Sequence, residues 1–93
     1  MSEIKLVRAR RVKALDGHRL EIVFDDDTMG VIDLGDFVKL GPATEPLRDP
    51  AFFAQVFIEM GVPTWPNGCD IDAIVIRALM ASQGALKPVT EAA

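Results

Sequence analysis

The chain has 93 residues, of which 49% are apolar and 26% charged, and its net charge is −4 at pH 7. This length allows one domain with one small core, and the acidic balance argues against general nucleic-acid binding. No apolar run approaches the roughly 18–20 residues of a membrane span, and the charged N-terminus lacks the apolar stretch of a signal peptide. Because one cysteine cannot form an internal disulfide, we expect a cytoplasmic protein that is not bound to a membrane.

The first part of the chain predicts three strands joined by short turns. These strands span residues 4–15, 18–25 and 28–34. Asp16-Gly17 is a strong signal for a two-residue hairpin, and the second strand alternates apolar and polar side chains with the period of a half-buried strand. Asp26-Asp27 predicts strain or a longer loop, because a tight turn needs positive φ at both central positions. Gly30 suggests a bulge or the close approach of another backbone.

The middle of the chain predicts short elements separated by loops. They are one helical turn over 36–40, a loop over 41–46, a short helix from Pro50, a strand over 55–60 and an extended piece over 63–66. Asp49 can cap the short helix, and proline suits the first helical position. Asn67-Gly68 predicts a further turn.

The clearest helix is predicted over residues 71–83, capped by Asp70 or Asp72 and stopped by Gly84. Its spacing predicts one apolar stripe that covers a sheet face lined by Leu20, Ile22 and Phe24. The stripe consists of Ile71, Ile74, Val75, Ala78 and Leu79. Residues 1–84 then form a single α+β domain, and residues 85–93 a flexible C-terminal tail. The predicted architecture is an antiparallel sheet of four to five strands with this helix and the short middle helix on one face.

Basic residues are concentrated near the N-terminus, which carries six of the ten in the chain within its first 19 positions. The basic strip consists of Arg8, Arg10, Arg11, Lys13 and Arg19. Such residues can protect a sheet edge against aggregation, or they can contact an acidic partner or a phosphate backbone. No aromatic residue is interleaved in the strip, although proteins that bind single strands usually stack bases on aromatic rings.

No catalytic, cofactor or metal site is expected. Asp25, Asp26 and Asp27 could offer oxygen ligands to a hard cation, but the spacing of a calcium loop is absent, so a solvated turn is favoured. His18 has no second group positioned with it for acid–base work. Cys69 precedes a helix, where a thiol can be reactive, and it is the basis of the one enzymatic alternative.

Two further features favour binding to another protein. Trp65 and Asn67 belong to the most distinctive stretch, in which Trp65 is either a lid on the core or an exposed anchor for a partner. Ile76 and Met80 lie four residues apart and off the predicted stripe, so the last helix is apolar on two faces. Such a helix is deeply buried or docked on another chain, and we expect a homodimer.

Four segments together resemble a small bacterial family, the domain of unknown function numbered 2442. They span residues 24–27, 31–34, 47–53 and 65–71. The resemblance implies an α+β domain with no established reaction, in which some relatives carry a helix-turn-helix domain or lie beside toxin–antitoxin genes. The family often has glycine where Asp27 stands and a small residue where Cys69 stands, which argues against a shared catalytic cysteine.

We therefore expect a non-enzymatic protein-interaction module, with an unknown protein partner and an accessory or antitoxin-like role. The alternative is a nucleic-acid accessory domain that uses the basic strip. An enzyme that uses Cys69 or the aspartates is a third hypothesis.

Overall fold

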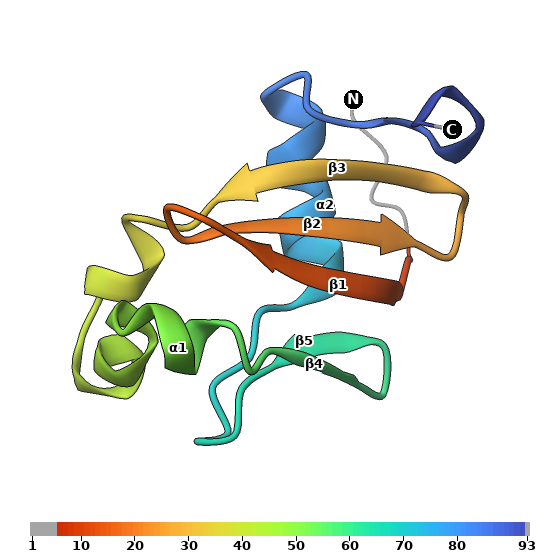
Figure 1. Cartoon of the computed structure of the whole chain (residues 1–93). Helices are drawn as coiled ribbons and strands as arrows, with labels where there is room; N and C mark the ends of the chain where they lie inside the picture. Colours follow the sequence, from red (N-terminus) through yellow and green to blue (C-terminus); the bar gives the residue numbers. More distant parts are fainter. Residues whose placement is uncertain (1–5, 93) are drawn as a thin grey trace.

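The fold is built on a four-stranded antiparallel sheet, which the computed structural model describes within residues 6–92 (Figure 1). The strands β1 (Ala9–Leu15), β2 (Arg19–Phe24), β3 (Thr28–Asp33) and β6 (Lys87–Pro88) lie in the order β1-β2-β3-β6. The first three form the predicted meander, and the α+β class is confirmed. The start of the first predicted strand, residues 4 and 5, lies outside the described residues.

Both turns of the meander contain residues with positive φ. The first loop has three residues, Asp16–His18, where the sequence predicts two, and φ is 75° at Gly17 and 56° at His18. In the second turn φ is 65° at Asp27. A side chain with a Cβ pays a steric cost in this conformation that glycine avoids. The strain expected for the two adjacent aspartates is therefore located at Asp27.

Three short helical segments follow β3. The segment η1 (Phe37–Lys39) lies where one helical turn is predicted, but η2 (Pro42–Arg48) includes residues predicted to form a loop. Proline at its first position and the Thr44 hydroxyl, which hydrogen-bonds to the Gly41 and Val38 carbonyls, stabilise η2. Helix α1 (Pro50–Phe53) begins after Asp49, as predicted, and the Asp49 carboxylate accepts a hydrogen bond from the Ala51 N–H at 3.2 Å.

A second, smaller sheet lies beside the edge strand β1. It is a hairpin of β4 (Phe57–Glu59), which lies within the predicted strand over 55–60, and β5 (Val62–Thr64), which begins one residue before the predicted extended piece over 63–66. The Ala9 N–H donates a hydrogen bond to the Gly61 carbonyl at 2.7 Å, which joins β1 to the tip of this hairpin. The two sheets are therefore held together at one end of β1.

Helix α2 (Ala73–Ser82) lies behind the strands in Figure 1 and covers one face of the sheet. Asp72 caps it, because its carboxylate accepts a hydrogen bond from the Ile74 N–H at 2.8 Å. Leu20, Ile22 and Phe24 are fully buried on the sheet face beneath the helix, as predicted. Among the described residues, no helix is long and apolar enough to cross a membrane.

The buried side of α2 is not the predicted stripe. Ile76 and Met80 are fully buried, whereas Val75 is 55% and Leu79 48% exposed. The spacing alone does not select a face, because the helix is apolar on both sides. With Ile76 and Met80 facing the sheet, the side chain of Arg77 reaches Asp26 in the turn between β2 and β3.

The segment after α2 packs on the sheet, although residues 85–93 are predicted to form a flexible tail. Met29 pairs with Lys87 in β6, and the Val89 N–H donates a hydrogen bond to the Asp27 carbonyl at 2.9 Å. The chain crosses Gly30 so closely that a Cβ there would lie 2.3 Å from the Ala85 carbonyl oxygen. The predicted close approach at Gly30 is therefore confirmed. It leaves no room for a larger side chain.

Candidate functional site

Trp65 is part of the core, which decides between its two predicted roles. Its side chain is fully buried, and its indole Nε1–H donates a hydrogen bond to the Phe53 carbonyl at 2.9 Å. The ring centroid lies 5.6 Å from that of Phe53 and 6.4 Å from that of Phe37. A buried indole with a satisfied N–H is a stability element. The interpretation of Trp65 as an exposed anchor is wrong.

The other predicted interaction residues fall into two groups. Ile76 and Met80 are also fully buried, so neither side chain is available to a partner while the domain is folded. Asn67 is exposed but already bonded within the chain. Its Nδ2 donates to the Ala43 carbonyl at 3.0 Å, and its Oδ1 accepts from the Cys69 N–H at 3.1 Å. Asn67 therefore ties two loops together.

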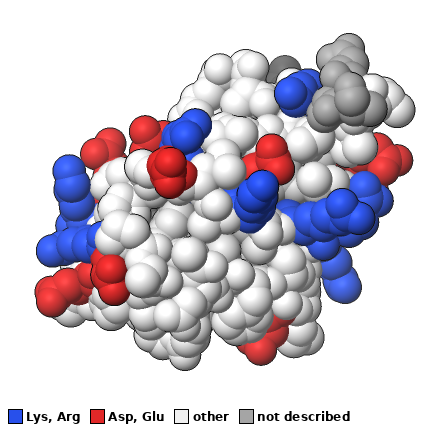
Figure 2. Space-filling model, in the orientation of Figure 1, with Lys and Arg blue, Asp and Glu red and all other residues white. Residues whose placement is uncertain are grey.

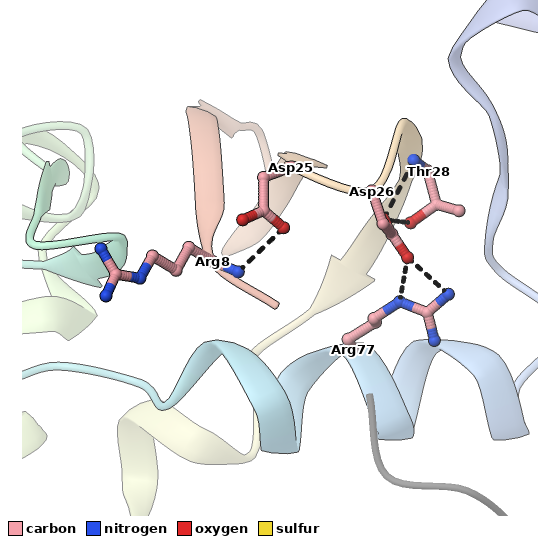
Figure 3. Close-up of polar contacts among 5 residues, drawn as sticks. All are labelled: Arg8, Asp25, Asp26, Thr28 and Arg77. Atoms are coloured by element: carbon pink, nitrogen blue, oxygen red, sulfur yellow. Dashed lines mark hydrogen bonds and ion pairs between the residues drawn. The ribbon is translucent and has the colours of Figure 1, made fainter. Parts of the chain in front are cut away.

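The aspartate turn is a network of hydrogen bonds within the fold (Figure 3). Asp25 accepts a hydrogen bond from the Arg8 N–H at 3.2 Å. Asp26 accepts from the Thr28 hydroxyl at 2.6 Å and forms an ion pair with Arg77, at 3.0 Å from Nε and 2.9 Å from an η nitrogen. Both members of this ion pair are largely buried, with side-chain exposures of 14% and 18%. The pair fastens the β2–β3 turn to α2.

The expected solvated turn describes Asp25 and Asp27, which are exposed, but it is wrong for Asp26, whose side chain is 14% exposed and paired with Arg77. Asp27 forms an exposed ion pair with Arg10 at 3.3 Å. Among the described residues, no group of three or more His, Cys, Asp or Glu side chains is arranged to hold a metal ion.

His18 and Cys69 both serve local structure. The Nε2 atom of His18 lies 2.9 Å from the Arg48 carbonyl oxygen, and its ring meets the edge of Phe53 at a centroid distance of 5.1 Å. Burial raises the pKa of the Cys69 thiol above its ordinary value, and the neighbouring charge of Asp70 raises this pKa further. A raised pKa leaves less thiolate at neutral pH, which disfavours a nucleophilic role for Cys69.

The fold separates the basic strip into parts. Arg10 pairs with Asp27, the Nε–H of Arg19 donates to the Asp16 carbonyl at 2.8 Å, and the side chain of Arg8 lies against Gly61. A bulge between Ala9 and Arg11 interrupts the register of β1 with β2. Arg11 and Lys13 lie together on the sheet face that is turned away from α2, a face that they share with Arg19.

We call this face the open face. The register places ten residues on it: Arg11, Lys13, Leu15, Arg19, Glu21, Val23, Met29, Val31, Asp33 and Lys87. Directly opposed residues in neighbouring antiparallel strands share a face, so the register places four of them in one row across all four strands. This central row is Arg11–Val23–Met29–Lys87. It has an apolar pair in the middle and a cation at each end.

A groove with a volume of about 570 Å³ runs over the open face toward β4. Val23 and Met29 line it from the sheet, Phe57 from β4, and Val89 from the segment after β6. Arg11, Lys13 and Glu21 also line it. Figure 2 views the molecule from this side and shows acidic and basic side chains intermingled, with a broad area free of charge at the lower centre.

Sequence reasoning missed part of this site. The sequence places Lys87 in a flexible tail, because the two residues of β6, one of them a proline, give no strand signal. Val23 and Met29 did carry a signal, because an apolar Val23 breaks the alternation of its strand. That break indicates a second face that is partly covered.

The fold and this face define an α+β domain with a sheet covered on one side. The chain belongs to the family described as "Protein of unknown function (DUF2442)", whose model matches residues 9–80. The resemblance seen in the sequence is thereby confirmed. The match includes Arg11, Val23 and Met29 of the central row but ends before Lys87. No curated protein and no solved structure matches the chain.

Proposed function

We propose that the protein is a non-enzymatic interaction module that binds another protein on the open face of its sheet. The observation that carries this proposal is the groove of about 570 Å³ with Val23, Met29 and Phe57 in its lining. Phe57 is 41% exposed, and no described element covers the groove. Exposed apolar surface rimmed by polar groups is typical of protein-interaction sites.

A pull-down from the native host tests the proposal with tagged full-length variants. Val23→Thr combined with Met29→Gln removes apolar surface from the groove with little change in volume. Leu40→Thr combined with Met60→Gln makes a similar chemical change at two exposed positions outside the groove and is the matched control. We expect the first variant alone to lose the co-purifying protein, with both variants folded by circular dichroism. Equal capture by the two variants contradicts the proposal.

Homodimerisation remains part of the proposal and has a test of its own. Helix α2 keeps a second apolar surface at Val75 and Leu79, and a small domain gains stability when a second copy covers such a surface. Size-exclusion chromatography with light scattering should give twice the mass of the 10.1 kDa chain. A monomer at every concentration tested contradicts this part. The cytoplasmic location and the accessory or antitoxin-like role also remain proposals.

The nucleic-acid alternative has one observation in its favour. Arg11, Lys13 and Lys87 share the open face, and among the described residues none of the three forms an ion pair. The other members of the basic strip are engaged within the fold, however, which lowers the charge density available to a phosphate backbone. A gel shift with DNA and RNA at low salt tests the alternative. Binding that falls steeply with salt supports it, and no shift removes it.

A further inference from the structure

We infer that the partner presents an acidic, extended segment to the open face, with an apolar side chain between two carboxylates. This inference rests on the proposed function and specifies the chemistry of the partner. It begins from the central row, in which Arg11 and Lys87 stand at the two ends and Val23 and Met29 between them.

The spacing of the central row sets the pattern of the segment. Neighbouring strands lie about 4.8 Å apart, so the backbones at Arg11 and Lys87 are about 14 Å apart across three intervals. An extended chain covers this distance in about four residues, and its alternate side chains point to the same side. A segment that crosses the strands therefore directs residues i, i+2 and i+4 toward the sheet. In the pattern acidic–any–apolar–any–acidic, the two acidic side chains meet the cations at the ends of the row, Arg11 and Lys87. The apolar side chain meets the apolar pair between them.

The charge of the open face favours an acidic occupant. It carries four cations, Arg11, Lys13, Arg19 and Lys87, against two carboxylates, Glu21 and Asp33, in a chain whose net charge is −4. Charges of opposite sign attract an acidic segment and fix its register on the row. Among the described residues these cations have no ion-pair partner, so binding breaks no existing pair.

The same charges disfavour two other occupants. A second copy bound face to face would bring four cations against four cations, and such like-charge contacts destabilise a complex. A nucleic acid would meet the aliphatic pair Val23 and Met29 at the centre of the row, where single-strand binders place aromatic rings. The apolar pair fits an aliphatic or aromatic side chain of a polypeptide.

A displayed library of random dodecapeptides, selected on the immobilised full-length protein, tests the inference. We expect enriched peptides with acidic residues four apart and an apolar residue midway. Synthetic copies of these peptides are then titrated by fluorescence polarisation against three variants: Arg11→Glu, Lys87→Glu and Lys39→Glu. The last is the matched control, because Lys39 is an exposed lysine of η1 outside the groove.

Each reversal on the row should weaken binding by about tenfold, and the control by much less. Binding should also weaken as salt is raised. Enriched peptides without acidic residues, yet dependent on Val23 and Met29, overturn the inference and leave the proposed function standing. Selection that enriches no peptide also overturns it, and the pull-down then decides the proposed function separately. Tighter binding of a fifteen-residue oligothymidine than of any peptide overturns it in favour of nucleic acid.

Discussion

The two faces of the four-stranded sheet use the same strands in different ways. On the covered face, Leu20, Ile22 and Phe24 are fully buried against α2 and its neighbours. On the open face, Val23 and Met29 lie between charged residues and remain partly exposed. The comparison shows that β2 contributes to the core with one set of side chains and to a surface groove with the other. We therefore expect substitutions on the two faces to change stability and partner binding separately.

The largest effect is expected from Trp65→Ala in the hydrophobic core. The change removes a fully buried side chain and the hydrogen bond from Nε1 to the Phe53 carbonyl, so it should lower the free energy of unfolding by about 3–5 kcal/mol. Urea unfolding followed by circular dichroism measures this loss. Trp65→Phe keeps most of the apolar volume and should lose less. A loss below about 1 kcal/mol for Trp65→Ala would indicate that the side chain is an exposed anchor and not part of the core.

A second change tests how closely the chain packs on the covered face. Gly30→Ala places a Cβ 2.3 Å from the Ala85 carbonyl oxygen and 2.8 Å from the Met80 Cε atom. We expect a loss of about 1–3 kcal/mol, because backbone must move to relieve the contact. Gly41→Ala is the control, since nothing lies within 4 Å of the added atom. Equal unfolding midpoints for the two variants would contradict the close approach.

The ion pair between Asp26 and Arg77 links the four-stranded sheet to helix α2. Asp26→Asn removes the charge that pairs with a largely buried guanidinium and should cost about 1–3 kcal/mol in thermal unfolding. Asp33→Asn is a control on an exposed aspartate of β3. If both changes lower the melting temperature equally, the ion pair does not position α2.

A small gain in stability is expected from Asp27→Gly in the β2–β3 turn. Glycine adopts the observed φ of 65° without the cost of a Cβ, while the lost ion pair with Arg10 is exposed and weak. The free energy of unfolding should rise by up to about 1 kcal/mol. Arg10→Ala measures the ion pair alone. A clear loss of stability in Asp27→Gly that Arg10→Ala does not reproduce would show that the conformation is not strained.

The alkylation rate of the Cys69 thiol tests the fold around this residue without a change in sequence. Because burial and Asp70 raise its pKa, the thiolate is scarce at neutral pH and becomes abundant only at higher pH than for a free thiol. Alkylation by iodoacetamide should therefore be slower than for free cysteine in the native protein and recover in urea. Faster alkylation in the native state would indicate an activated cysteine and revive the enzymatic hypothesis.

The sequence predicts the covered face better than the open one. Alternation at Leu20, Ile22 and Phe24 identifies the strand and its buried side, and Asp49 and Asp72 mark the helix starts through their caps. These signals are local and strong. Each depends on residues close together in the chain.

Features that depend on distant contacts could not be predicted in the same way. Helix α2 is apolar on two sides, so periodicity does not select its buried side, and the contact between Arg77 and Asp26 joins residues that are 51 positions apart in the sequence. The pairing of Lys87 with Met29 has no local signal, because β6 gains its order from β3. The central row therefore becomes visible only when the register of four strands is known.

The most direct test of the open face as the binding surface is site-specific photo-crosslinking. Benzoylphenylalanine replaces Val31, which is 37% exposed on the open face, or Leu79, which is 48% exposed on α2. Each protein is irradiated in extracts of the native host, and crosslinked partners are identified by mass spectrometry. We predict that a protein other than this chain crosslinks from position 31 and not from position 79, where a crosslink between two copies would report the proposed homodimer. A partner crosslinked from position 79 alone would contradict the account.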